Sequence, residues 1–237
     1  MNPLLLPLVA AQAAYVHRTI GKEPRPEGPT NGFVPGPAAG ATENRPETMR
    51  LLVIGDSSAS GRGAPTHDLA FAGSMARAIA ARTARPVQWR AMGKYGATSE
   101  KIRHGILTEV RGEWDLAVLL VGVNDILARR STTAWATDLT AIVEALQQHA
   151  AHTVVPGIPE FDAFPSLPRT LRRYLAERGA ALDTAARLVC AGRTSVQWVS
   201  SAELGPAEPS FFAADGFHAS PAGYERWARA ITDHLDL

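Results

Sequence analysis

Three side chains with the chemistry of a hydrolytic active site are distributed along this 237-residue chain. Ser57 comes shortly after the apolar run at 51–54, where a parallel strand would deliver a residue to the edge of a sheet. A serine hydroxyl becomes a nucleophile when an adjacent base takes its proton and another group orients that base. Asp215 and His218 could supply both, because a single turn would let the carboxylate reach Nδ1 and leave Nε2 facing Ser57. The structural alternatives are a polar turn at Ser57 and a helix cap at His218.

Three hydrogen-bond donors are candidates for stabilising the oxyanion that forms during acyl transfer. They are the backbone N–H of Ser57, the backbone N–H of Gly96 in the loop 93–98, and the side-chain amide of Asn124 after the apolar run 115–121. Loss of one such donor costs roughly 3 kcal/mol of transition-state stabilisation. The simpler interpretations are an ordinary glycine loop and an Asn-Asp turn.

Other chemistries fit the sequence poorly. A phosphate-binding loop counted from Gly55 would need glycine and lysine where Ser60 and Gly61 stand, and a nucleophile elbow would need glycine in place of Ala59. Histidine and cysteine spacings match no metal site, and the single cysteine, Cys190, forms no disulfide framework. The formal net charge of +1 gives no reason to expect nucleic acid. The sequence therefore implies no metal site.

Alternating strands and helices must position these residues. Apolar runs predict strands at 51–55, 87–92, 115–121, 152–157 and 196–200, and helical periodicity predicts helices at 67–83, 99–110, 132–146, 168–192 and 221–235. This alternation predicts an α/β fold, a three-layer α/β/α sandwich around a five-stranded parallel sheet in the flavodoxin-like order 2-1-3-4-5. The loops after parallel strands share one edge, so we expect the candidate residues to converge there.

The first 48 residues differ in composition from the remainder, which we assign to one catalytic domain at 49–237. Residues 1–16 are mostly apolar but fall short of the roughly 20 residues that span a membrane, and no basic residue precedes them as in an export signal. Two interpretations stay open: a segment that packs on the domain or associates weakly with a membrane through residues 1–18, and a weak export signal. Location in the cytoplasm, at a membrane or outside the cell therefore stays open. The Pro- and Gly-rich residues 21–48 predict an extended linker without packed elements.

The candidate motifs resemble the four signature blocks of the SGNH hydrolases, also called GDSL hydrolases. The blocks occur in order as Gly55-Asp56-Ser57, the loop ending at Gly96, Gly122-x-Asn124-Asp125 and Asp215-x-x-His218. The resemblance covers residues 51–235. It implies that Ser57 is the nucleophile, His218 the base and Asp215 its orienting partner. It also implies that Ser57, Gly96 and Asn124 form the oxyanion hole.

By this resemblance the chain is a serine ester hydrolase that cleaves carboxylic esters, short-acyl esters foremost, through an acyl-enzyme and without a cofactor. A carbohydrate O-acetylesterase, a lysophospholipase or thioesterase, or an acyltransferase could use the same site, and a flavodoxin-like module could instead bind a small ligand without reacting. We expect Phe161, Phe164, Leu167 and Phe217 to form an apolar wall beside the substrate. The alternative for the segment 158–168 is a crossover loop packed on the domain. The leucine usual after the family's serine is Ser58 here, which should affect loop packing more than chemistry.

Overall fold

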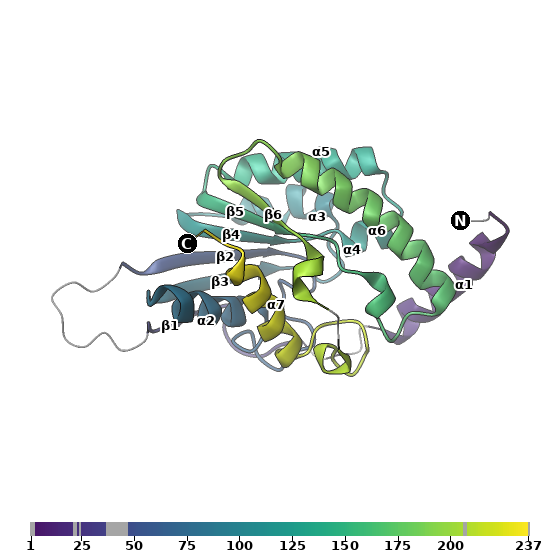
Figure 1. Cartoon of the computed structure of the whole chain (residues 1–237), viewed down its shortest axis with the longest axis horizontal. Helices are drawn as coiled ribbons and strands as arrows, with labels where there is room; N and C mark the ends of the chain where they lie inside the picture. The colour runs from purple at the N-terminus through teal and green to yellow at the C-terminus, as the bar shows by residue number, and fades with distance from the viewer. Residues whose placement is uncertain (1–2, 21–22, 24, 37–46, 206–207, 237) are drawn as a thin grey trace.

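A mostly parallel sheet forms the centre of the computed structural model, which describes all residues except 1–2, 21–22, 24, 37–46, 206–207 and 237 (Figure 1). Among the described residues the sheet has six strands in the order β1-β3-β2-β4-β5-β6. The strands are β1 (Asn31–Val34), β2 (Met49–Gly55), β3 (Val87–Gly93), β4 (Trp114–Leu120), β5 (Ala150–Pro156) and β6 (Val196–Val199). Strands β2 to β6 pair in parallel. Their spatial order confirms the predicted order 2-1-3-4-5.

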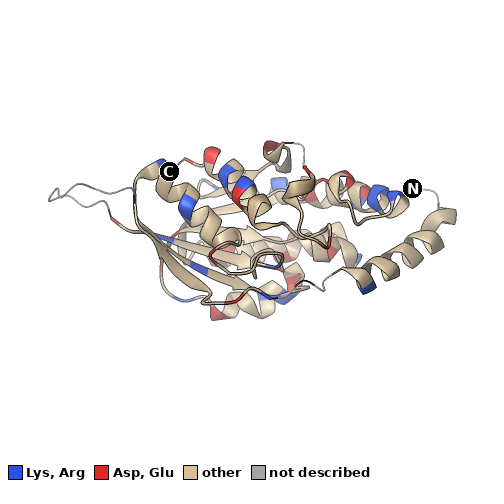
Figure 2. Ribbon diagram, turned by 90° about the horizontal axis from the view of Figure 1, so that it is seen from below, with Lys and Arg blue, Asp and Glu red and all other residues tan. Residues whose placement is uncertain are grey.

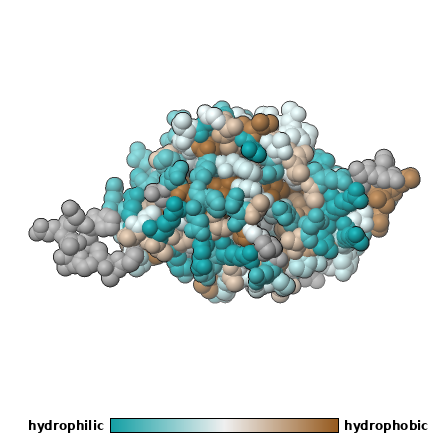
Figure 3. All heavy atoms as spheres, viewed as in Figure 1, coloured by the Kyte–Doolittle hydropathy of each residue, from teal (hydrophilic) through white to brown (hydrophobic). Residues whose placement is uncertain are grey.

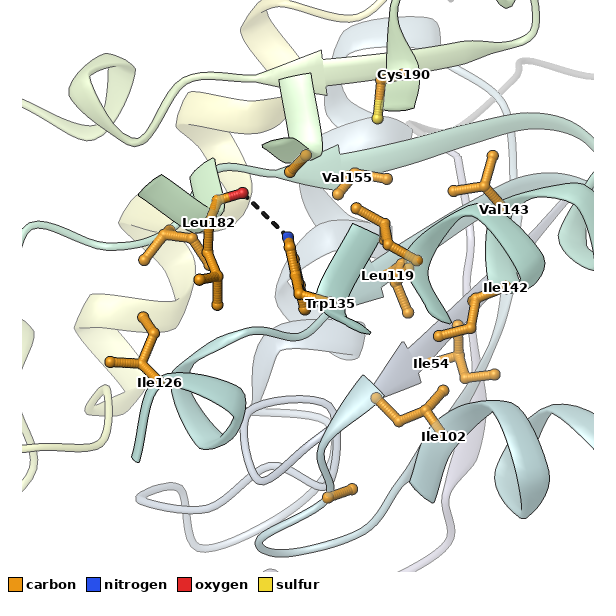
Figure 4. Close-up of a cluster of buried hydrophobic side chains, with 14 of the residues drawn as sticks. Ile54, Ile102, Leu119, Ile126, Trp135, Ile142, Val143, Val155, Leu182 and Cys190 are labelled. Carbon is orange, nitrogen blue, oxygen red and sulfur yellow. Dashed lines mark hydrogen bonds between the residues drawn. The ribbon is translucent and has the colours of Figure 1, made fainter. Parts of the chain in front are cut away.

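Helices cover both faces of the sheet, which confirms the predicted three layers (Figure 1). The α-helices of the described residues are α1 (Leu6–Thr19), α2 (Phe71–Thr83), α3 (Ser99–His104), α4 (Val123–Leu127), α5 (Thr132–Leu146), α6 (Arg169–Cys190) and α7 (Pro221–Asp233). Side chains alternate across β2, so Leu51 packs with α2 and α7, whereas Leu52 packs with the layer of α5 and α6. In that second layer Trp135 donates a hydrogen bond to the carbonyl oxygen of Leu182 at 3.0 Å, which joins α5 to α6 (Figure 4).

The structure corrects the sequence prediction in one part of the first 48 residues. The segment 21–48 was expected to contain no packed element. It contains β1, which pairs antiparallel with β3. Edge strand β3 has backbone N–H and C=O groups that any extended segment can pair with, whatever its side chains. Gly32 also lies directly over the ring of Trp89, where an added Cβ would be 2.6 Å from the ring. The assignment of 49–237 as a separate domain stays a prediction.

The N-terminal segment forms helix α1, which packs against α6. The helix and the turn before it expose the large side chains Leu4, Leu5, Leu6, Leu8 and Tyr15. Brown, apolar atoms lie at this end of the molecule, at the right of Figure 3. Charged side chains are spread over the helices of both layers, whereas α1 is uncharged apart from its C-terminal end (Figure 2). Within the described residues no helix combines the length and apolar character that a membrane span requires. Weak membrane association through residues 1–18 stays a prediction.

Candidate active site

Ser57, His218 and Asp215 form a connected set of side chains at the carboxyl edge of the sheet. The Nε2 atom of His218 lies 3.2 Å from the Oγ atom of Ser57, and Nδ1 lies 2.6 Å from Oδ2 of Asp215. Ser57 and His218 are buried although 161 residues separate them in the chain. The fold therefore brings together a hydroxyl, an imidazole and a carboxylate in the arrangement that nucleophilic acyl transfer requires.

A tight turn before α7 places the carboxylate beside the imidazole. The N–H of Gly216 donates to the carbonyl oxygen of Ala213 at 2.9 Å, and the N–H of Ala213 donates to that of His218 at 2.8 Å. Gly216 has a φ of +62°, a left-handed conformation that glycine adopts without steric cost. The other carboxylate oxygen of Asp215, Oδ1, accepts the N–H groups of Phe217 and His218, each at 2.9 Å. The carboxylate is therefore held by backbone as well as by the imidazole.

These contacts decide the ionisation of Asp215. Burial disfavours the carboxylate, but the side-chain and backbone hydrogen bonds from His218 outweigh this and lower the pKa of Asp215 below its usual value. The carboxylate therefore stays ionised at neutral pH, in the form that can orient an imidazole and stabilise its cation.

The turn after β2 explains why glycine and aspartate precede the serine. A Cβ atom at Gly55 would lie 2.0 Å from the carbonyl oxygen of Leu120, so only glycine lets the end of β2 approach β4 so closely. The N–H of Asp56 donates to the same Leu120 oxygen at 3.0 Å, and Oδ1 of Asp56 accepts the N–H of Ser58 at 2.9 Å. Burial raises the pKa of Asp56 to about 6, although the Ser58 N–H opposes the rise. Asp56 thus holds the turn that presents Ser57.

The three predicted oxyanion donors border one cavity together with the His218 ring. Gly96 has a φ of +69°, and within the described part of the chain neither its N–H nor that of Ser57 has a protein acceptor. Asn124 lies in the first turn of α4, a short helix that the sequence did not predict. Its Nδ2 donates one hydrogen to the carbonyl oxygen of Ala97 at 3.0 Å, which leaves the second amide hydrogen for another acceptor.

A buried acidic side chain that the sequence analysis assigned to no role joins the loops that carry Gly96 and Asn124. Asp125 is fully buried and accepts hydrogen bonds from the N–H of Ser99 at 2.9 Å and from its Oγ at 2.6 Å. The Nε atom of Arg130 lies 3.1 Å from Oδ1 of Asp125, as an ion pair without hydrogen-bond geometry. Burial raises the pKa of Asp125, and the contacts with Ser99 and Arg130 oppose the rise. The signal in the sequence was an acidic residue directly after the candidate donor.

A cavity of about 640 Å³ opens beside the Ser57 hydroxyl. Its lining is mainly apolar and includes two of the four residues predicted to form the substrate wall, Phe164 and Phe217, whose ring centroids are 5.3 Å apart. Phe161 and Leu167 do not border the cavity, and both are buried in the core. The prediction is therefore wrong for these two residues, which pack in the apolar core instead. Phe161 contacts Phe164 with ring centroids 5.4 Å apart, but only Phe164 borders the cavity.

The described residues contain no group of three or more histidine, cysteine, aspartate or glutamate side chains arranged to hold a metal ion. Cys190 is buried in α6, and burial raises the pKa of its thiol to about 11. This places the thiol in its protonated, unreactive form at neutral pH.

Comparison with known proteins identifies the family. Residues 53–226 match the model of the GDSL-like lipase/acylhydrolase family. A GDSL-like esterase of Mycobacterium tuberculosis is 27% identical over 253 residues, which cover 97% of this chain and 79% of that protein.

Solved structures of low sequence identity share the fold. LAE5, an α/β hydrolase enzyme from the metagenome of Lake Arreo in Spain, superposes with a TM-score of 0.61 at 18% identity, over 80% of this chain and 97% of that one. A lipase/acylhydrolase from Enterococcus faecalis superposes with a TM-score of 0.56 at 22% identity, over 78% of this chain and 94% of that one. With most of its length matched by the family model, this chain belongs to the GDSL-like lipase/acylhydrolase family and is an ester-bond hydrolase.

Proposed function

We propose that the protein is a serine esterase that cleaves carboxylic esters through an acyl-enzyme on Ser57. The observation that carries this proposal is the line of contacts from the Ser57 hydroxyl through His218 to Asp215, at 3.2 and 2.6 Å, at the edge of an apolar cavity. A hydroxyl joined to an imidazole and a carboxylate is the arrangement that lowers the cost of removing the serine proton.

In the first half-reaction the Oγ atom of Ser57 attacks the carbonyl carbon of the ester while Nε2 of His218 takes the hydroxyl proton. The carbonyl oxygen becomes an oxyanion, which accepts hydrogen bonds from the N–H groups of Ser57 and Gly96 and from the free amide hydrogen of Asn124. Asp215 stabilises the imidazolium that forms. The bond to the alcohol oxygen then breaks, and the imidazolium gives its proton to that oxygen, so the alcohol leaves and the acyl-enzyme remains.

In the second half-reaction water takes the place of the alcohol. Nε2 of His218 removes a proton from the water while its oxygen attacks the acyl carbon, and the oxyanion again lies among the same three donors. The bond to the Ser57 oxygen breaks, the imidazolium returns the proton to Oγ, and the carboxylic acid departs. The enzyme is regenerated without a cofactor.

Hydrolysis of a p-nitrophenyl ester series with acyl chains of about two to twelve carbons tests the proposal. We expect the full chain to hydrolyse at least one ester and Ser57→Ala to lose this turnover. Ser131→Ala is the matched control, because Ser131 caps α5 away from the cavity and its loss costs about 1 kcal/mol of stability without touching the site. A fluorophosphonate probe should label Ser57, as identified by peptide mass spectrometry. Turnover that survives in Ser57→Ala, or labelling elsewhere, would contradict the proposal.

A further inference from the structure

Helix α1 forms part of the cavity that contains Ser57, although it precedes the residues that match the family model. Ala13 and Val16 of the helix border the cavity, and so does Ile20, the residue directly after it. They recur at spacings of three and four residues, so they share one face of the helix and its C-terminal end. The wall that they form comes from this chain's own N-terminal segment.

Two kinds of contact hold α1 in this position. Val9 and Val16 are buried in the same apolar cluster as Leu171 of α6. The Oε1 atom of Gln12 accepts the backbone N–H of Leu171 at 2.9 Å. That N–H belongs to the first turn of α6, where it has no partner inside the helix and where the capping residue, Pro168, offers no side-chain acceptor. Gln12 therefore provides the acceptor that an N–H group in the first turn of α6 would otherwise lack, and this hydrogen bond fixes where α1 lies along α6.

The cavity that Ser57 and α1 both border has the chemical character of an alkyl-chain site. The side chains that border it include Val123 and Leu127 of α4, together with Phe164 and Leu171. The volume of about 640 Å³ lies within the range of sites that enclose a ligand much larger than an acetyl group. An apolar chain gains about 0.8 kcal/mol for each methylene group removed from water.

We propose that α1 forms the distal wall of an acyl-chain subsite, and that the preferred substrates are esters of linear acyl chains longer than the short ones expected from sequence. This inference rests on the proposed function, since it takes Ser57 as the acyl acceptor. A gain of about 0.8 kcal/mol per buried methylene corresponds to a rise in kcat/KM of about fourfold per carbon, until the chain meets α1.

The test compares two identical substitutions on adjacent positions of α1 with the same p-nitrophenyl series. Ala13→Phe fills the distal end of the cavity, whereas Ala14→Phe places the same ring on the exposed side of the helix. We expect Ala13→Phe to lower kcat/KM for the longest esters by about tenfold or more and to leave the acetyl ester within about twofold of the unsubstituted chain. Ala14→Phe should retain the full profile. Ile20→Ala enlarges the same wall and should move the optimum toward longer chains.

The outcomes separate this inference from the proposed function. If Ser57-dependent turnover is present but Ala13→Phe and Ile20→Ala change all chain lengths alike, or none, α1 is no part of an acyl subsite. An unsubstituted chain that prefers the acetyl ester would also overturn the inference. If no ester shows Ser57-dependent turnover, the proposed function itself fails. Thermal melting of Ala13→Phe and Ala14→Phe checks that the helix stays docked, and Ala13→Leu replaces Ala13→Phe if that variant melts early.

Discussion

Removal of the Asp125 carboxylate tests whether one buried ion pair holds the two loops that carry the proposed oxyanion donors. Asp125 is fully buried, and Asp125→Ala would leave both the N–H and the Oγ of Ser99 without their acceptor. Breaking a buried pair by removing one partner costs about 3–5 kcal/mol. Arg130 keeps its contacts with Glu100 and Asp138, so its charge stays compensated and we expect the lower part of this range.

Glu100 provides the matched control because it pairs with the same arginine at the surface. Its carboxylate lies 2.6 Å from Nη1 of Arg130, but its side chain is 58% exposed. An exposed pair of this kind contributes about 0–1 kcal/mol, so Glu100→Ala should be nearly neutral. The two variants remove the same chemical group from the same partner, and they differ mainly in burial and in the contact with Ser99.

The assay is urea unfolding followed by the fluorescence of the five tryptophans, with kcat measured on one p-nitrophenyl ester in parallel. Asp125→Asn, which retains an acceptor for the Ser99 N–H, should lose less stability and serves if the alanine variant does not fold. We also expect kcat to fall in both Asp125 variants and not in Glu100→Ala. Equal stability of Asp125→Ala and Glu100→Ala would refute the argument from burial. A stability loss with unchanged kcat would mean that the pair holds the fold but does not position the donors.

Three further predictions concern single side chains of the site. Burial raises the pKa of Asp56 from 3.8 to about 6, so the folded protein binds a proton on this carboxyl group more tightly than the unfolded chain does. The protonated carboxyl group therefore adds stability that is fully present below about pH 4 and is lost as the pH rises toward 6. This difference between the folded and unfolded pKa of Asp56 corresponds to about 3 kcal/mol, so the unfolding free energy of Asp56→Asn should rise by about that much relative to the unsubstituted chain between pH 4 and 7. Urea titrations that show the same difference at every pH would contradict this. Asn124→Ala should lower kcat by about 10²- to 10³-fold in steady-state assays, and an unchanged kcat would remove Asn124 from the oxyanion hole. Asp215→Asn keeps an acceptor for the backbone N–H groups of Phe217 and His218 but holds the imidazole in the wrong tautomer, so kcat should fall by roughly 10⁴-fold. A loss of kcat below tenfold would exclude an orienting role.

The sequence alone was sufficient to predict the parallel sheet and to predict that the candidate residues lie close together in space. Apolar runs and helical periodicity are local signals, and a right-handed crossover leaves few ways to order five parallel strands. The predicted start of the last helix at residue 221 is correct for α7, because helix capping depends on a few adjacent residues: the Ser220 side chain accepts the N–H of Gly223. Ser57 and His218 lie within 3.2 Å because loops after parallel strands open at one edge.

Tertiary structure decided the features that depend on contacts between distant segments. Strand β1 joins the sheet through backbone groups of β3, so its side chains carry no periodic signal. Which aromatic residues of the segment 158–168 border the cavity depends on loop packing, and Phe161 and Phe164 differ in this although they are three residues apart. The docking of α1 depends on Gln12 meeting the first turn of α6, 159 residues further along the chain. A sequence pattern records which face of an element is apolar, whereas the partner of that face is set only when the whole chain packs.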